Sequence, residues 1–232
     1  MSSYAYTLID FQYIAAGAAI LARGGGGSYC DAIRVLEELA AGGWSGAVQV
    51  KDYDGATNCC VLALMGSPDA ADHLTLADIE YSITNTINFY QASTSSLLGC
   101  VIPVEIGAIN SLVPLIAALL PTNGIQWVVN GDGAGRAVPE LPQTTYSGSA
   151  ALAASPCVLA NNASGTVAVQ SATLTAVTAA QVEALAGGIV SAFGSFSGIA
   201  LWPSMASNGY ALKGNYIAGT LTQAWAFGQY LL

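Results

Sequence analysis

The residues best suited to chemistry are three charged side chains in the glycine-rich segment 130–140. Asp132 could act as a base or a ligand, and Arg136 could hold an anion or polarise a carbonyl group. Glu140 could hold Arg136 in place. The segment follows the apolar run 125–129, and open α/β sheets place their ligand sites on loops that follow strands. The alternative is an Arg–carboxylate network that orders a long loop without doing chemistry.

A second segment with chemical potential covers residues 103–111. Glu105 ends an apolar, strand-like run, where a carboxylate is costly unless it is paired or bound to a ligand. It could therefore be catalytic, or it could form a structural ion pair with an arginine. Asn110 and Ser111 could bind substrate, but both are also placed to cap the helix that follows.

A third segment is a run of small residues that opens a predicted helix, namely Gly24, Gly25, Gly26, Gly27 and Ser28. Such a run lets the backbone approach a ligand and presents N–H groups to an anion. No Lys-Ser or Lys-Thr pair follows it, so it differs from the phosphate loop of nucleotide hydrolases. The alternative use is a flexible hinge between two helices. Arg23, beside the run, could pair with a carboxylate of the site.

Together the run GGGGS, the segment PVEIGAINS and the segment NGDGAGRAVPE resemble the N-terminal domain of the S-methyl-thiohydantoin desulfurase-like proteins, a hydantoinase-associated family. The resemblance extends from about residue 7 to residue 147 and is weaker beyond. It implies an α/β domain followed by a smaller β-rich domain, and hydrolysis at a cyclic amide or thioimidate carbon. The residues that match the family's motifs are Gly24, Gly25, Gly26, Gly27, Ser28, Glu105, Asn110, Ser111, Asp132, Gly133, Gly135, Arg136, Pro139 and Glu140.

The chain departs from the family pattern at several positions. Ala108 and Ile109 stand where small glycines are usual, and Asn130 stands where an aspartate is more typical. Pro142 interrupts a stretch that commonly continues without proline. We expect the β-rich second domain to be absent, because the chain ends near the family's return helix. These departures bear on catalysis more than on the fold.

The leading hypothesis is a desulfurase-like or hydantoinase-like α/β domain that acts on a small cyclic amide. In it, Asp132 or Glu105 activates water, and Arg136 holds the carbonyl or anionic group of the substrate. The backbone N–H groups of residues 25–28 stabilise the developing negative charge, and Gly133 and Glu140 complete the substrate-binding set with Asn110 and Ser111.

A metal is a further option at these motifs. Glu105, Asp132 and Glu140 could bind a hard divalent cation through oxygen. Zinc and iron are less expected because the three motifs hold no histidine, and His73 is the only histidine in the chain. No other cofactor is evident.

Hydrophobic periodicity predicts the elements that position these motifs. Alternating strands and helices indicate an α/β fold with a mixed, mostly parallel sheet flanked by helices. We expect one domain over residues 1–232, with a sub-boundary near 146–156 as the alternative. The predicted helices cover residues 7–22, 29–40, 75–90, 111–120, 178–193 and 220–232. The predicted strands cover residues 47–50, 59–65, 98–106, 125–129 and 199–202, with a hairpin around 166–175.

The charge of the chain limits its partners. The sequence has 5 Lys+Arg and 14 Asp+Glu, a net charge of −9, so nucleic acid and anionic membrane surfaces are disfavoured. After Glu140 only Glu183 and Lys213 carry formal charge. An uncharged surface favours self-association into a homo-oligomer or a filament. The rival hypothesis is therefore a non-catalytic structural protein that keeps the fold and forms a homopolymer.

The compartment is not specified by any clear signal. No signal peptide is evident, so we expect a cytoplasmic protein by default and an extracellular one if it forms filaments. The uncharged stretch 184–202 is long enough to cross a bilayer, but its glycines and serines divide it into two elements. The five cysteines show no paired spacing, so we expect small core residues. Cys59 and Cys60 should point to opposite faces of a strand.

Overall fold

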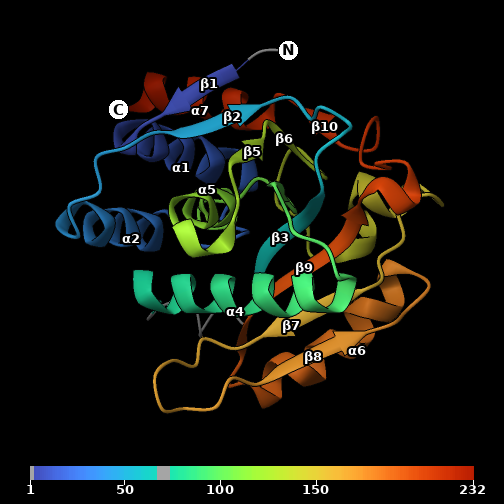
Figure 1. Cartoon of the computed structure of the whole chain (residues 1–232). Helices are drawn as coiled ribbons and strands as arrows, with labels where there is room; N and C mark the ends of the chain where they lie inside the picture. The colour runs from blue at the N-terminus through green and yellow to red at the C-terminus, as the bar shows by residue number, and fades with distance from the viewer. Residues whose placement is uncertain (1–2, 67–73) are drawn as a thin grey trace.

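The computed structural model describes residues 3–66 and 74–232, and a mixed eight-stranded sheet forms its centre (Figure 1). The strand order is β1-β2-β5-β4-β3-β9-β7-β8. The strands are β1 (Ser3–Tyr6), β2 (Val48–Lys51), β3 (Cys59–Gly66), β4 (Cys100–Pro103), β5 (Trp127–Val129), β7 (Cys157–Ala160), β8 (Ser171–Leu174) and β9 (Phe196–Ser204). A separate two-stranded sheet pairs β6 (Gly131–Asp132) with β10 (Ile217–Ala218).

The pairing confirms the predicted α/β class. Strands β2, β5, β4 and β3 run parallel and form the middle of the sheet. Strand β1 joins one side and β9, β7 and β8 join the other, each antiparallel to its neighbour. The hairpin expected around residues 166–175 contains β8, and β8 pairs with β7, which precedes the predicted range.

Six α-helices of the described residues flank the sheet. They are α1 (Leu8–Ala22), α2 (Tyr29–Ala41), α4 (Leu76–Thr94), α5 (Leu112–Leu119), α6 (Ala179–Ala192) and α7 (Thr220–Leu231). Short 3₁₀ turns cover Pro121–Asn123, Leu141–Gln143, Thr145–Gly148 and Ala206–Asn208.

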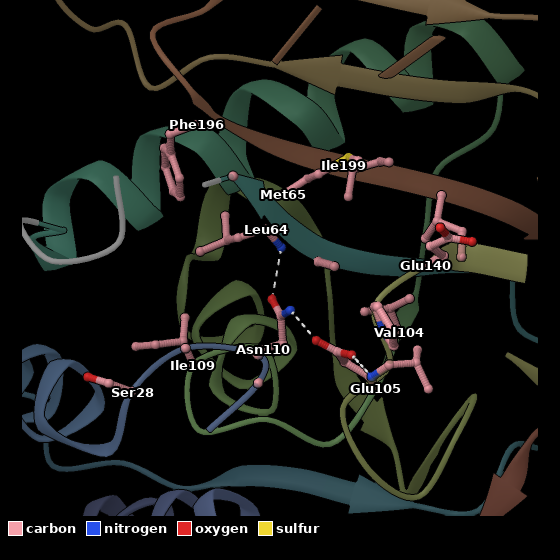
Figure 2. Close-up of a pocket in the computed structure, with 18 of the residues that line it drawn as sticks. Ser28, Leu64, Met65, Val104, Glu105, Ile109, Asn110, Glu140, Phe196 and Ile199 are labelled. Carbon is pink, nitrogen blue, oxygen red and sulfur yellow. Dashed lines mark hydrogen bonds between the residues drawn. The ribbon is translucent and has the colours of Figure 1, made fainter. Parts of the chain in front are cut away.

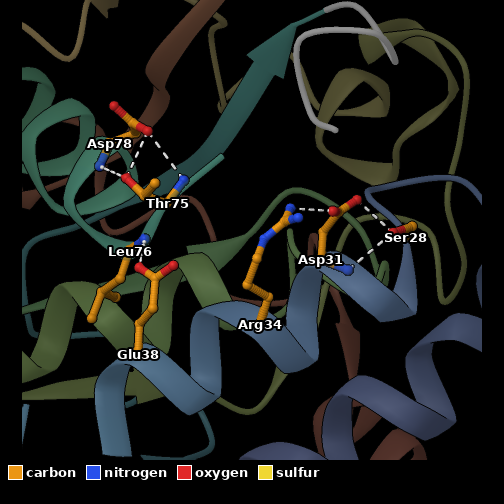
Figure 3. Close-up of polar contacts among 7 residues, drawn as sticks. All are labelled: Ser28, Asp31, Arg34, Glu38, Thr75, Leu76 and Asp78. Carbon is orange, nitrogen blue, oxygen red and sulfur yellow. Dashed lines mark hydrogen bonds and ion pairs between the residues drawn. The ribbon is translucent and has the colours of Figure 1, made fainter. Parts of the chain in front are cut away.

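Side chains at the predicted helix starts take up the free backbone N–H groups. At α4 the Thr75 hydroxyl accepts a hydrogen bond from the Asp78 N–H, and the Asp78 carboxylate accepts one from the Thr75 N–H (Figure 3). Glu38 of α2 accepts a further bond from the N–H of Leu76 at 2.7 Å, which joins the two helices. Thr178 caps α6 in the same way as Thr75 caps α4. These caps explain why α4 and α6 begin where the sequence predicts.

The two faces of the sheet bury two separate cores. Along β3, Cys60 and Leu62 pack into the core beneath α1, α2, α4, α5 and α7, whereas Cys59, Val61 and Ala63 pack into the core beneath α6. This alternation follows from the two-residue period of a strand, and it confirms that the adjacent cysteines point to opposite faces. All five cysteines are free thiols, and Cys30 is the exposed one.

Helices α1 and α7 lie side by side although they stand at opposite ends of the chain (Figure 1). Gly17 of α1 faces the Ala224 carbonyl oxygen, and Gly228 of α7 faces the Tyr13 carbonyl oxygen. A Cβ atom at either glycine would clash with that oxygen. Glycine therefore sets how closely these two helices approach.

The structure corrects several predicted boundaries. The predicted strand 98–106 is paired only over β4, because the chain leaves the sheet after Pro103 to build the loop 104–111. Strand β9 is longer than predicted, and β1 and β7 have no counterpart in the prediction. The uncharged stretch 184–202 divides into the end of α6 and most of β9, as expected. Among the described residues, no helix is long and apolar enough to cross a membrane.

Candidate functional site

The three sequence motifs meet around one cavity of about 450 Å³ at the carboxyl ends of β3 and β4 (Figure 2). The glycine run, the loop after β4 and the loop after β6 each contribute to its lining. The motif residues that line the cavity are Gly24, Gly25, Gly26, Gly27, Ser28, Glu105, Asn110, Pro139 and Glu140. A site at the carboxyl ends of parallel strands is the position expected for an open α/β sheet.

The glycine run packs tightly against both other motifs. The Gly26 carbonyl oxygen accepts hydrogen bonds from the Ile109 N–H at 2.9 Å and from the Asn110 N–H at 3.1 Å. Gly26 has a φ of +66°, and a Cβ there would lie 2.7 Å from Gly107 Cα and 2.9 Å from Glu105 Oε1. A Cβ at Gly25 would lie 2.6 Å from the Ala137 Cβ. These contacts make the run a packed wall of the cavity, in contrast to the flexible hinge considered from sequence.

Glu105 is held by a short chain of hydrogen bonds that begins on β3 (Figure 2). Strand β4 pairs with β3 as far as Pro103 opposite Leu62, and two residues later the Leu64 N–H donates to Asn110 Oδ1 at 3.1 Å. The Asn110 Nδ2 group then donates to Glu105 Oε1 at 2.9 Å. On the other side, the Val138 N–H donates to Glu105 Oε2 at 2.7 Å. Beyond the end of β4, the Asn110 side chain thus serves as the hydrogen-bond partner of β3, and it also orients the Glu105 carboxylate.

The surroundings of Glu105 raise its pKa. Glu105 is 6% exposed, and burial penalises its charged form, an effect only partly offset by the hydrogen bonds that Val138 and Asn110 donate to it. No arginine pairs with it in residues 3–66 and 74–232, so the ion pair considered from sequence is not found. A buried carboxyl with a raised pKa that lines a cavity is suited to accept and return a proton.

Ser111 does not cap α5 through its side chain. It stands at the N-cap position, but its hydroxyl accepts a hydrogen bond from the Gly107 N–H at 3.2 Å, within the preceding loop. Asn110 is likewise engaged with Leu64 and Glu105 instead of the helix. The capping role considered for both residues is therefore wrong, because the loop and the carboxylate take up these side chains.

Asp132 lies outside the cavity lining and is fully buried. Its carboxylate accepts hydrogen bonds from the Ala134 N–H at 2.9 Å and the Gly135 N–H at 2.8 Å, which fold the loop back on itself. Burial raises the pKa of Asp132 to about 6. Gly133 packs beneath Tyr146, whose ring a Cβ would meet at 2.5 Å. Both residues thus shape the loop that carries Val138.

The charges of the segment 130–140 do not form the network considered from sequence. Arg136 is exposed, and within the described part of the chain no hydrogen bond or ion pair holds its guanidinium. Glu140 is exposed as well, at the cavity lining. The described residues contain no group of three or more His, Cys, Asp and Glu side chains that could hold a metal ion. Binding of a divalent cation by Glu105, Asp132 and Glu140 stays a prediction, and His73 lies outside the described residues.

Several lining residues were not identified from sequence. Leu64, Met65, Phe196 and Ile199 form an apolar wall on β3 and β9. Glu183 of α6 also lines the cavity, and its Oε2 accepts a hydrogen bond from the Leu141 N–H at 3.0 Å. Glu183 is one of only two charged residues after Glu140, and this isolation in the sequence could have identified it as a candidate site residue.

Asp31 is a further lining residue, and it occupies the N-terminus of α2 (Figure 3). The Ser28 Oγ donates to its carboxylate and in turn accepts from the Asp31 N–H at 3.1 Å. Arg34 forms an ion pair with the same carboxylate. The Ser-x-x-Asp spacing was a capping signal. Because Asp31 already places a negative charge at this helix end, the end is less suited to an anionic ligand than the glycine run suggested.

Comparisons with known proteins support the resemblance found in the motifs. The family model described as "S-Me-THD-like, N-terminal domain" matches residues 9–171. An X-ray crystal structure of a protein from Chromobacterium violaceum is similar over 98% of this chain, with 27% sequence identity and a TM-score of 0.80. The match covers 61% of that protein, so this chain spans about three fifths of its length. No curated protein matches the chain.

Proposed function

We propose that this chain, which belongs to the S-Me-THD-like family, hydrolyses a small cyclic amide or thiohydantoin in the cavity around Glu105. The observation that carries the proposal is the position of a buried, oriented carboxyl beside the glycine run. Glu105 Oε1 would lie 2.9 Å from a Cβ at Gly26, so the carboxyl and the backbone of the run are neighbours.

Two backbone N–H groups of the glycine run are available for the anion-stabilising role predicted from the sequence. Among the described residues, the N–H groups of Gly26 and Gly27 donate to no protein acceptor, and both residues line the cavity. Such free donors can bind a carbonyl oxygen and stabilise the negative charge that develops on it during attack.

The chemistry follows from these two elements. Water attacks the ring carbonyl carbon and gives a proton to Glu105, while the carbonyl oxygen takes up negative charge near the free N–H groups. The ring C–N bond then breaks, and Glu105 returns the proton to the leaving nitrogen. In a methylthio-substituted ring, water attacks the ring carbon that bears the sulfur and gives its proton to Glu105; the C–S bond then breaks, and the proton goes to the sulfur, which leaves as methanethiol. In either case one water is consumed and Glu105 is regenerated.

Glu105 is preferred over Asp132 as the base. The Asp132 carboxylate is engaged by two N–H groups of its own loop and does not line the cavity. The predicted role of Arg136 in holding the carbonyl or anionic group requires its exposed side chain to turn toward the cavity.

The test is turnover of hydantoin and of a methylthio-substituted thiohydantoin by the parent and its variants. Glu105→Gln should lower kcat by at least about 100-fold, because it removes the proton acceptor. Glu37→Gln, an exposed change on α2 away from the cavity, should leave kcat unchanged. Arg136→Ala tests whether Arg136 holds the carbonyl or anionic group of the substrate. An inactive parent, or full activity in Glu105→Gln with native circular dichroism, would refute the proposal.

A second candidate function is the structural homopolymer, and the open edges of the sheet favour it. In the described part of the chain, β1 and β8 are the outer strands, and neither carries a charge or a proline. Natural edge strands usually carry such residues to prevent pairing between molecules. Large apolar side chains are exposed near β8, among them Val167, Val169 and Val177.

Electron microscopy and sedimentation velocity test this candidate. The parent should form extended assemblies at high concentration, and Thr173→Lys on the exposed side of β8 should shorten or abolish them. Discrete small particles in the parent at all concentrations would count against it.

A further inference from the structure

The cavity carries an excess of negative charge that bears on the kind of substrate it accepts. Four carboxylates are among its lining residues, on Asp31, Glu105, Glu140 and Glu183, and no Lys or Arg is among the described residues that line it. Arg34 offsets Asp31. Among the described residues, three carboxylates from three different parts of the chain then remain without a cationic partner.

The contacts of these three carboxylates are with neutral groups or with solvent. Glu105 accepts from an amide side chain and a backbone N–H, and Glu183 accepts from the backbone N–H of Leu141. Glu140 is exposed. None of them is neutralised by an ion pair within residues 3–66 and 74–232.

The other Lys and Arg side chains are not among the residues that line the cavity. Lys51 lies over the Trp127 ring, 4.1 Å from its centroid, and Lys213 packs near Gly55. Arg23 and Arg136 are exposed on loops that border the cavity, and neither is among its lining residues. An anionic ligand would thus meet like charges, whereas a cationic ligand would meet opposite ones.

The opposite wall of the cavity is apolar. Leu64, Met65, Phe196 and Ile199 can cover an uncharged ring or alkyl group. From the charge and the wall together, we propose that the substrate is a cyclic amide whose side chain carries a protonated amine or a guanidinium group, and that rings bearing a carboxylate are rejected. This inference rests on the proposed hydrolysis, since it names the substrate class of the same cavity.

Calorimetric binding of three hydantoins to the parent tests the inference. Their side chains are of similar size and end in an ammonium group, a methyl group or a carboxylate. Affinity should fall in that order, with at least about tenfold between the first and the last, and the spread should narrow as salt is added. Glu140→Gln and Glu183→Gln should each reduce the preference for cation over anion by roughly 1.4- to 5-fold, whereas the control Glu37→Gln should not change it.

The outcomes separate the inference from the proposed function. Equal or reversed affinities in the parent, or no binding of any of the three, would overturn the inference. A specific loss of binding of the anionic hydantoin in Arg136→Gln would also overturn it, because Arg136 would then be an anion clamp. If the expected order appears without turnover, the ligand class stands and the hydrolysis fails. If turnover occurs at equal efficiency on all three, the hydrolysis stands and the inference fails.

Discussion

Gly24 and Gly27 allow a matched test of how the glycine run is packed. Both have a φ of +92° and both belong to the run, so replacement by alanine introduces the same backbone strain at each. A Cβ at Gly24 would have no atom within 4 Å. A Cβ at Gly27 would lie 2.5 Å from the Ile109 Cβ and closer still to its Cγ1.

The magnitudes follow from these two environments. A left-handed conformation costs a non-glycine residue about 1–2 kcal/mol, which is the whole expected loss for Gly24→Ala. Gly27→Ala adds an overpacking cost of about 1–3 kcal/mol. Ile109 cannot easily move away, because its side chain is 3% exposed and its N–H is bonded to the Gly26 carbonyl oxygen. We therefore expect Gly27→Ala to be less stable than Gly24→Ala by about 1–3 kcal/mol.

Equilibrium unfolding in urea, followed by circular dichroism, measures this difference. The entropy that alanine removes from the unfolded chain is the same for both variants and cancels in the comparison. Two variants that agree within about 0.5 kcal/mol, the usual scatter for independent sites, would refute the packed arrangement of the run against the loop after β4.

Three further predictions test other parts of the structure. Asn110→Ala should lower the free energy of unfolding by about 1–3 kcal/mol, because the half-buried Leu64 N–H and the buried Glu105 each lose a hydrogen-bond partner. Asn162→Ala, which removes a less buried amide bonded to Asp78, should cost less. Burial raises the pKa of Asp132 to about 6 in the folded chain, above its ordinary value of 3.8, so the folded state binds more protons between these values and loses stability as pH rises through them. Asp132→Asn should remove this pH dependence, which amounts to up to about 3 kcal/mol in the free energy of unfolding. Urea titrations from about pH 4 to pH 7 measure it. An unchanged slope of the free energy of unfolding against pH would contradict the raised pKa of Asp132. Gly17→Ala and Gly228→Ala should each destabilise the fold by about 1–3 kcal/mol, because their Cβ atoms would meet backbone oxygens. Gly187→Ala and Gly188→Ala, on the open face of α6, should instead stabilise it by about 0.5–1 kcal/mol. Equal shifts in Tm for the two pairs would contradict the close α1–α7 contact.

The helices and the central strands were predictable because their signals are local. Capping residues such as Thr75 and Thr178 act within one turn, and β3 is visible as a run of consecutive apolar residues. Strands β1 and β7 were missed because short segments have too little pattern of their own. Their strand conformation is stabilised by pairing with β2 and β9, which lie far along the chain.

The site was predictable as three motifs and not as one arrangement. Glu105 and the glycine run were identified by type, since a carboxylate ending an apolar strand and a run of glycines are both costly without a purpose. The segment 130–140 looked like a charge cluster, yet the structure separates a buried Asp132 from an exposed Arg136. Whether a side chain in a loop points inward depends on backbone turns that composition does not specify.

The sequence by itself determined the α/β class, the family and the motifs that surround the cavity, because short-range periodicity and residue type are enough for these. Only the tertiary structure decided which residues meet. It linked Leu64, Asn110 and Glu105 into one chain of hydrogen bonds, brought Glu183 from α6 to the cavity and directed the Asp132 carboxylate into its own loop. The physical reason is that the contacts of Leu64 with Asn110 and of Glu183 with Leu141 join residues far apart in the chain, whereas the direction of the Glu105 and Asp132 carboxylates depends on backbone turns that residue type does not specify.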